Sequence, residues 1–471
     1  MNQPNIIYIL ADDMGYGDVS HLNNQAAFKT PCLDKMCEGG LHFTDAHATS
    51  AVCTPSRYGI ITGRYNWRSS LKKGVLFGYD APLIEKERPT VASYLQNKGY
   101  RTACIGKWHL GLSWSMKDES NKESIDFSKS LLDTPVDHGF DYFYGISGSL
   151  DMPPYVYVEN RHVTAEPNRV VTCDTRTSVK NTKHWFRTGE TGADYVHEEV
   201  LTKLTEKALE KIDDFKDEPF FIYFPITGPH TPILPSKEFV GKSGTTAYGD
   251  FVLMCDDVVG QVNKKLEELG IADNTLVVFT SDNGCSPMAN FPELSQFGHN
   301  PSYIFRGTKA DIFDGGHRIP LVIKWPKVVG ENIHSDTPVC LVDFFATVAD
   351  ILEDPLEKTV GEDSVSEYAL WQTQNQADYH REWMVHHSIN GSFSVRKGPW
   401  KLIACPDSGG WSEPLPGTMP DNAFEFQLYN MKTDIREQFN LSEEREDIVE
   451  ELLAYLLNHT AYKESVETYA K

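Results

Sequence analysis

The chain has 471 residues, of which 40% are hydrophobic and 24% charged, a composition typical of a globular enzyme with more than one domain. No apolar run is long enough to cross a membrane, and the formal net charge of −23 argues against nucleic acid or an anionic membrane as a partner. The nine cysteines lack the close spacing of a disulfide scaffold, and their odd number leaves at least one thiol unpaired, for which Cys53 is the natural candidate. Cys32 and Cys37 either pair or stay free.

The N-terminus leads directly into a predicted strand. Asn5 to Leu10 is a short apolar run, and it ends at the acidic pair Asp12-Asp13. Because only a few residues precede the strand, we expect no signal peptide here. The protein is then either cytoplasmic or exported with a signal that this chain lacks.

The next feature is a cysteine placed at a predicted helix start. Pro55 suits the first turn of a helix, and Gly63 suits its end. Cys53 then lies at the helix N-terminus, where backbone N–H groups favour an anion, and Arg57 projects from the same face one turn later. This pattern indicates an anion site next to a sulfur nucleophile, although the pentapeptide alone also suits a buried cysteine before an ordinary helix.

Further apolar runs alternate with helical patterns along the chain. The predicted strands are Arg101–Ile105, Phe220–Phe224 and Thr275–Thr280, and the predicted helices are Thr90–Lys98, Val196–Phe215 and Asp250–Leu269. These runs are rich in strand-forming residues and lack alternation, as expected for strands buried on both faces of a mainly parallel sheet with helices on each side. This predicts an α/β domain.

Chemically reactive side chains follow these strands. Lys107 and His109 come after the second predicted strand, His230 after the third, and Asp282-Asn283 after the fourth. In open α/β sheets, ligands bind at the carboxyl ends of the strands. The shared position of these groups predicts one site at that edge of the sheet.

The acidic groups at these strand ends are hard oxygen ligands. Asp12, Asp13, Asp282 and Asn283 offer three carboxylates and an amide oxygen, which suit Ca²⁺ or Mg²⁺ much better than zinc. Each pair alone also suits a solvated turn. Together they predict a site for one divalent cation.

The pattern changes near residue 375. The segments Glu382–His387, Phe393–Arg396, Trp400–Ala404 and Gln427–Tyr429 read as short strands, and a helix is expected over Glu444–Leu457. We therefore predict two domains: residues 1–375 as the catalytic α/β domain and 376–471 as a small α+β unit with an antiparallel sheet. The long loop Cys405–Pro420 carries one large aromatic side chain, Trp411.

Several motifs resemble those of one enzyme family. Cys53 to Arg64 (CTPSRYGIITGR) is similar to the signature of the type I sulfatases, C-x-P-S-R-x-x-x-x-T-G-R, and residues 106–111 (GKWHLG) match a second family motif. The resemblance implies an alkaline phosphatase-like fold for the large domain and formylglycine at position 53, made by oxidation of the cysteine. It also implies a requirement for a formylglycine-generating or anaerobic sulfatase-maturating enzyme.

The resemblance also implies roles for individual residues. The metal ligands, for a Ca²⁺ or less commonly a Mg²⁺ ion, are Asp12, Asp13, Asp282, Asn283 and the modified Cys53. The catalytic and sulfate-binding residues are Cys53, Arg57, Lys107, His109, His230 and Lys309. The expected acid is His230, with Lys309 as the second choice, and the expected base is His109. For Arg318, we expect a structural role. His317 and Trp411 are weaker candidates for substrate contact, and residues 112–135 and 147–160 are expected to line the rim of the pocket.

The expected substrate is a sulfated carbohydrate, such as a glycosaminoglycan or algal glycan fragment, because the chain resembles bacterial carbohydrate sulfatases. The same resemblance favours a periplasmic or extracellular location. The oligomeric state, the sugar and the sulfate position stay open.

Two alternative functions are a phosphonate or phosphate diester hydrolase of the same superfamily and a non-catalytic binder of sulfated glycans. A binder would be expected to have lost a nucleophile, a metal ligand or a lysine, and here each is present.

Overall fold

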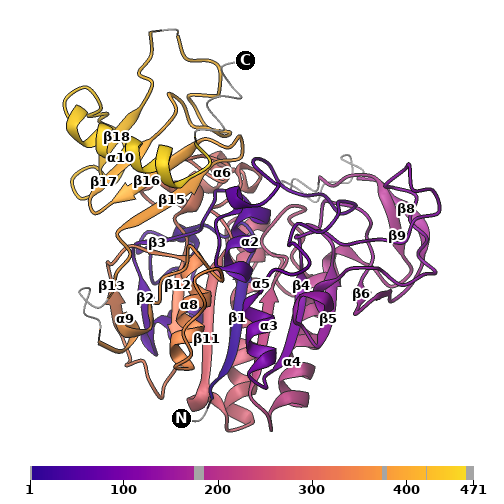
Figure 1. The fold of residues 1–471 in the computed structure, drawn as a ribbon. Helices are drawn as coiled ribbons and strands as arrows, with labels where there is room; N and C mark the ends of the chain where they lie inside the picture. Colours follow the sequence, from indigo (N-terminus) through magenta and orange to yellow (C-terminus); the bar gives the residue numbers. More distant parts are fainter. Residues whose placement is uncertain (1–2, 174–184, 374–378, 421, 463–471) are drawn as a thin grey trace.

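The computed structural model describes residues 3–173, 185–373, 379–420 and 422–462, and it divides the chain between a large sheet and a smaller C-terminal sheet (Figure 1). The large sheet has 10 strands in the order β13-β2-β12-β11-β1-β10-β4-β5-β6-β7. In chain order these are β1 (Asn5–Ala11), β2 (Leu41–Phe43), β4 (Arg101–Lys107), β5 (Tyr142–Ile146), β6 (Val158–Glu159), β7 (His162–Val163), β10 (Phe220–Pro225), β11 (Thr275–Ser281), β12 (Leu321–Lys324) and β13 (Ile333–Ser335).

The centre of this sheet is parallel, as predicted. Strands β11, β1, β10, β4 and β5 run in one direction, whereas β12, on one side, and β6, on the other, are antiparallel to their neighbours. Every residue of β1, β10 and β11 is buried. Side chains on both faces of these strands are buried because both faces of the sheet are covered.

Helices cover the two faces. Side chains alternate along β1, so Ile6 and Tyr8 pack into one apolar core while Ile7 and Ile9 pack into the other. The first core includes α2 (Cys53–Thr62), α3 (Val91–Asn97), α8 (Phe344–Ile351) and α9 (Tyr368–Thr373), and the second includes α1 (Pro31–Glu38), α4 (Val200–Phe215) and α5 (Ala247–Glu268). The predicted α/β architecture is confirmed.

Short elements complete the large domain. Two small ladders pair β3 (Ala46–His47) with β14 (Val339–Cys340) and β8 (Pro167–Val171) with β9 (Gly189–Gly192). The short helices are α6 (Phe291–Ser295), α7 (Asp314–His317) and the 3-10 turns η1 (Tyr16–Asp18), η2 (Asn66–Arg68), η3 (Pro135–His138), η4 (His197–Glu199), η5 (Ala272–Asn274), η6 (Pro287–Ala289) and η7 (Leu341–Asp343). Cys32 and Cys37, which the sequence left open, are both free thiols. In the part of the chain that the structure describes, no helix is both long and apolar enough to span a membrane.

The C-terminal sheet is antiparallel, with the order β15-β16-β17-β18. Its strands are β15 (Trp383–His387), β16 (Phe393–Lys397), β17 (Trp400–Ile403) and β18 (Gln427–Asn430), and α10 (Glu446–His459) packs on it through Leu452 and Leu456. The predicted strands and helix are confirmed to within about two residues. The predicted boundary at residues 375–376 lies outside the described residues.

Candidate active site

Parallel strands bring the predicted groups to one edge of the sheet. Ala11 of β1 aligns with Ser281 of β11, and Leu10 aligns with Pro225 of β10. The segments that follow these strands therefore leave the sheet side by side, and they carry Asp12-Asp13, Asp282-Asn283 and His230. Lys107 is the last residue of β4, the next strand along.

Cys53 is the first residue of α2, as the position of Pro55 predicted. The helix ends at Gly63, whose φ of 64° is left-handed and whose N–H donates to the carbonyl of Gly59. The Cys53 side chain is buried, and its Sγ lies 3.7 Å from Asp12 Oδ1 and 3.9 Å from Asp13 Oδ1. Burial, and next the charge of Asp282, raise the pKa of this thiol well above its usual value. The unmodified cysteine is therefore protonated at neutral pH and is a poor nucleophile.

The oxygen ligands meet around Asp13. Its φ of 66° is left-handed, a conformation that non-glycine residues adopt mostly where the surrounding structure holds them. The Asp13 amide donates to Asp282 Oδ1 at 3.2 Å, and Asn283 Nδ2 donates to Asp13 Oδ1 at 2.8 Å. Asn283 Oδ1 is buried and has no hydrogen-bond partner in the described residues. A buried amide oxygen without a partner, beside carboxylates, fits a hard divalent cation.

A second grouping overlaps with this one. Asp12, Asp13, Cys53 and His230 each place one donor atom within 4.8 Å of the others. Asp282 lies outside that grouping, and its Oδ2 accepts from Arg57 Nε and Nη2 at 2.9 and 2.7 Å. For a Ca²⁺-class ion, we favour the oxygen donors over His230, because imidazole suits softer metals.

Each buried carboxylate has its own cation. Lys107 Nζ donates to both oxygens of Asp12 at 2.7 and 2.8 Å, Lys309 Nζ donates to Asp13 Oδ2 at 2.8 Å, and Arg57 binds Asp282. Burial opposes ionisation of Asp12 and Asp13, but the lysines and His230 outweigh it and hold the pKa of both carboxyl groups below the usual value. The cluster of three carboxylates and three cations is therefore electrically balanced despite the strongly negative chain.

His109 is held as a neutral imidazole. Burial, then Lys107 and Arg57, lower its pKa well below the usual value. Its Nε2 lies 2.7 Å from the Leu76 carbonyl, which can only accept, so Nε2 carries the proton. Nδ1 is then an unprotonated acceptor, and it is buried without a partner in the described residues. This is the state required of a base.

His230 is oriented in a similar way. Its Nδ1 lies 2.6 Å from the carbonyl oxygen of Thr231 and therefore donates to it. Its Nε2 faces Asp13 Oδ2 at 3.6 Å, and Nδ1 lies 3.9 Å from Asp151 Oδ1. Nε2 is thus the nitrogen available for proton transfer in the cluster.

The sequence did not single out the pair formed by Asp151 and Arg187. Arg187 Nη1 donates to Asp151 Oδ2 at 2.5 Å, while the buried Asp151 Oδ1 has no hydrogen-bond partner in the described residues. The Arg187 guanidinium lies over the rings of Phe77 and Trp185, at 5.2 and 4.7 Å from their centroids, and both rings are half-exposed. Asp151 falls within the predicted rim segment 147–160, but no motif signals it.

The loop that carries Trp411 is fixed beside Lys309. The Trp411 amide donates to Asp311 Oδ1 at 2.7 Å, and Asp311 lies two residues after Lys309. The Ala310 amide in turn donates to the carbonyl of Ala51, just before Cys53. The Trp411 side chain remains 47% exposed. A sugar contact for Trp411 stays a prediction, but the loop is placed where such a contact is feasible.

His317 is placed differently. Its side chain is fully buried, and its Nδ1 lies 2.9 Å from His47 Nδ1 while Lys401 Nζ lies 3.3 Å from its Nε2. These contacts belong to a cluster between the large domain and the C-terminal sheet, so the geometry offers no support for the predicted substrate contact. Arg318 binds Asp314 in the same cluster, in keeping with the structural role expected for it.

The comparisons with known proteins agree with this geometry. The sequence profile of the Sulfatase family matches residues 4–354. The chain is 33% identical to an N-acetylgalactosamine-6-O-sulfatase of Bacteroides thetaiotaomicron, over 96% of this chain and 92% of that protein. It is 31% identical to human steryl-sulfatase, over 82% of this chain and 72% of that protein.

A solved structure from work on the metabolism of multiple glycosaminoglycans by Bacteroides thetaiotaomicron superposes with a TM-score of 0.84 and 31% identity, covering 99% of this chain and 100% of that one. The match extends over both sheets, so the C-terminal unit is part of the shared architecture. The chain therefore belongs to the sulfatase family, and it is a sulfuric ester hydrolase.

Proposed function

We propose that the protein removes sulfate from a sulfated carbohydrate, with Cys53 converted to Cα-formylglycine and one Ca²⁺-class cation bound nearby. The observation that carries this proposal is the position of Cys53, at the start of α2 with its Sγ facing both Asp12 and Asp13. A thiol has no second hydroxyl to expel sulfate after the attack, whereas a hydrated aldehyde supplies one hydroxyl for attack and a second for release of sulfate.

The cation would be held by Asp12, Asp13, Asp282 and Asn283, the oxygen donors that converge at the ends of β1 and β11. When bound, such an ion supplies Lewis-acid stabilisation of charge on the sulfate oxygens. Ca²⁺ is the first choice, because the donors are all oxygen atoms, and Mg²⁺ is the alternative.

The chain's own residues then bind the ester and move protons. Lys107, Lys309 and Arg57 surround Cys53 with N–H donors. A bound divalent cation would offset part of the carboxylate charge that these groups balance, so that they can bind the sulfate oxygens. His230 presents Nε2 to the cluster and is the proposed proton donor to the departing alcohol. His109 presents an unprotonated Nδ1 and is the proposed acceptor.

A sugar substrate suits the rim of this site. Asp151 Oδ1, which has no hydrogen-bond partner among the described residues, is an acceptor for a sugar hydroxyl. The half-exposed Phe77, Trp185 and Trp411 offer flat apolar faces for a ring. Arg187 adds a positive charge for an anionic neighbouring unit. The name of the Bacteroides relative directs the first assays to 6-O-sulfated N-acetylhexosamines.

Two further parts of the proposal concern the cell. A formylglycine at position 53 requires a maturating enzyme, which makes that enzyme a transient partner. An enzyme of this kind that degrades glycans works outside the cytoplasm, so a periplasmic or extracellular location is proposed.

We also propose a division of the chain near residue 376, with catalysis in the large domain.

Mass spectrometry and a sulfate-release assay test the proposal together. The peptide containing position 53, from protein co-expressed with a maturating enzyme, is expected to carry the mass of formylglycine or its hydrate. Sulfate release is expected to be abolished in Cys53→Ala and unchanged in Cys32→Ala, which removes a half-buried thiol on α1. Full activity of protein carrying only unmodified Cys53 would refute the mechanism. A preference for matched phosphate esters over sulfate esters would refute the substrate class.

A further inference from the structure

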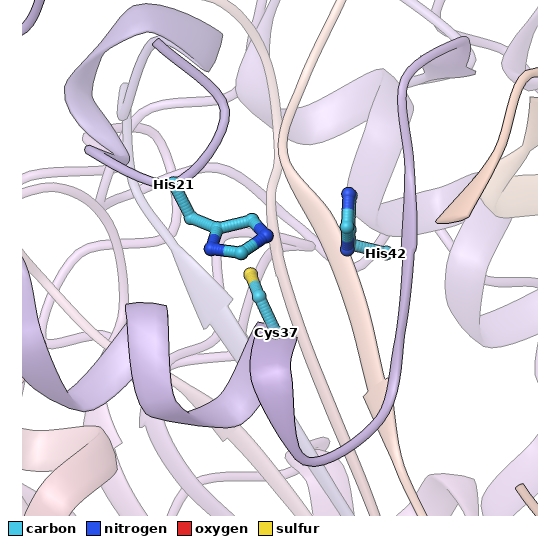
Figure 2. Close-up of side chains that lie close together, drawn as sticks. All are labelled: His21, Cys37 and His42. Atoms are coloured by element: carbon cyan, nitrogen blue, oxygen red, sulfur yellow. The ribbon is translucent and has the colours of Figure 1, made fainter. Parts of the chain in front are cut away.

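Three side chains with soft or borderline donor atoms meet at the edge of the large sheet. His21 lies in the loop after η1, Cys37 lies in the last turn of α1, and His42 lies on β2. Each offers one donor atom, and these atoms all lie within 4.8 Å of one another. Figure 2 shows the Cys37 sulfur beside the His21 ring, with the His42 ring facing the same space. The two imidazole rings meet edge to face, with 4.7 Å between their centroids.

The His42 ring is in the form that binds a metal. Burial, and next the neighbouring His21 and His334, lower the pKa of His42 to about 4, so its imidazole is neutral at physiological pH. His42 Nδ1 is buried and has no hydrogen-bond partner in the described part of the chain. The Cys37 side chain is fully buried. A neutral imidazole with a free nitrogen is the form that metals bind. Burial, and next the charges of Asp34 and Glu38, raise the pKa of the Cys37 thiol above its usual value, so a bound metal must itself displace that proton.

A second cluster of histidines differs from this one in its hydrogen bonding. His47, His317 and His386 also place donor atoms within 4.8 Å of one another. There, however, His47 Nδ1 pairs with His317 Nδ1 at 2.9 Å, and His47 Nε2 pairs with Asp45 Oδ1 at 2.7 Å. Lys401 Nζ lies 3.3 Å from His317 Nε2 as well. Ring nitrogens that already pair, next to a cation, do not offer a site for a positive metal ion.

We propose that His21, Cys37 and His42 form a second metal site, distinct from the oxygen cluster around Asp13, that binds Zn²⁺ with solvent as the fourth ligand. Thiolate and imidazole donors select zinc over calcium or magnesium. Binding replaces the proton of the Cys37 thiol with a Zn–S bond and releases that proton to solvent, without any change in oxidation state.

A metal here would stabilise the segment that follows the active-site carboxylates. His21 lies shortly after Asp18, whose Oδ2 accepts from the Gly15 amide at 2.7 Å and from the Tyr248 hydroxyl at 2.5 Å. The proposed site joins this segment to β2 and adds a second link to α1, to which the His21 amide and the Ser20 hydroxyl already donate at Asp34. Its role is structural, and the proposal does not depend on the sulfatase chemistry.

The test uses the full chain with the Cys53→Ala substitution and saturating Ca²⁺. This substitution removes the thiol of the oxygen cluster, so that any metal–thiolate signal comes from elsewhere. We expect one zinc ion per chain by elemental analysis after gel filtration, and a rise in Tm that saturates at one equivalent of Zn²⁺. Substitution of Co²⁺ is expected to give the near-ultraviolet charge-transfer band of a cobalt–thiolate bond.

Single variants locate the signal. His21→Ala and Cys37→Ala are each expected to abolish the band and to weaken zinc binding by about 100-fold or more, since loss of a ligand costs more than loss of an outer-shell partner. His21 is half-buried, so its removal leaves the fold intact and keeps the test valid if Cys37→Ala does not fold. Cys32→Ala, the other thiol of α1, is the matched control and is expected to keep both signals. Chains that retain no zinc, or a band that survives in His21→Ala, would overturn the proposal.

Discussion

Two charged clusters of this protein have equal numbers of acidic and basic side chains but different consequences. The active-site cluster pairs the carboxylates of Asp12, Asp13 and Asp282 with the cations of Arg57, Lys107 and Lys309. The interdomain cluster pairs Asp45, Asp314 and Glu437 with Arg318, Arg396 and Lys401. Each cluster thus balances three negative charges with three positive charges, so net charge does not distinguish them.

The two clusters differ in which buried polar atoms lack a hydrogen-bond partner. In the active site, Asn283 Oδ1 and His109 Nδ1 have no partner in the described residues, and a nucleophile position, Cys53, lies among the charges. Most of the interdomain cluster is paired, with His47 bound to Asp45 and to His317. In the described residues, His386 Nε2 has no hydrogen-bond partner, and Glu437 Oε1 has an ion pair with Lys401 in place of one. Buried acceptors without partners, rather than buried charges, are therefore the better sign of a reactive site.

The largest expected effect follows from removing an oxygen ligand. Asp13→Ala is expected to lower kcat/KM for a sulfate ester by about 10³-fold, because both the cation and the partner of Lys309 are lost. The variant should also lose the increase in Tm that Ca²⁺ gives to the unsubstituted protein. Asp257→Ala, a half-buried carboxylate on α5, is the control and should keep both properties. Full activity after exhaustive chelation would contradict the assignment.

The interdomain cluster is expected to show the opposite response. Lys401→Met leaves Asp314 and Glu437 with less compensation in a buried site, and it should lower the free energy of unfolding by about 3–5 kcal/mol. The folded fraction should retain its kcat. Lys397→Met, on the same sheet but paired with Glu382 and Glu451 at the surface, should cost about 1 kcal/mol or less. Urea unfolding measures both, and equal losses would remove the distinction between the clusters.

The histidines of the interdomain cluster predict a pH dependence. Burial, and next the charge of Arg318, lower the pKa of His47 from 6.5 to about 4. The unfolded chain therefore binds a proton that the folded one does not between these values, so His47 contributes stability above pH 6.5 that is lost as the pH falls toward 4. The loss at pH 5 should be about 2 kcal/mol.

A variant isolates this contribution. His47→Gln should flatten the slope of unfolding free energy against pH between 4 and 6.5, relative to the unsubstituted protein. The slopes of the two proteins must be compared, because burial raises the pKa of Glu437, and a raised carboxyl pKa makes the unfolding free energy fall as the pH rises, opposite to the effect of His47. Parallel slopes for the two proteins would show that His47 is not held neutral.

The smallest expected effect concerns the rim. If Trp411 contacts the sugar, Trp411→Ala should raise KM for a sulfated oligosaccharide about tenfold, the equivalent of one lost stacking contact, and leave KM for a small aryl sulfate unchanged. Phe424→Ala, a half-exposed aromatic residue in the same domain, is the control. Equal effects of Trp411→Ala on both substrates would make the loop structural and place sugar recognition in the large domain.

Local sequence determined most of the framework. The runs Asn5–Leu10 and Thr275–Thr280 are apolar at every position or nearly so, and that pattern depends only on neighbouring residues, so the buried strands and the groups that follow them were predictable. The start of α2 at Cys53 was also predictable, because Pro55 lies in the first turn of the helix, where the N–H that proline lacks would have no partner within the helix. The family motif then supplied roles for these residues.

Tertiary structure alone decided the rest. The sequence gives no signal for the Asp151–Arg187 pair, whose members lie 36 residues apart, or for the Asp311–Trp411 pair, whose members lie 100 apart. It also gave no sign that His317 joins His47 and Lys401, or that His21, Cys37 and His42 meet. Hydrogen bonds and ligand sites of this kind depend on the packing of distant segments. Each partner is constrained by a neighbour in space rather than in sequence, so such packing leaves no periodic pattern in the chain.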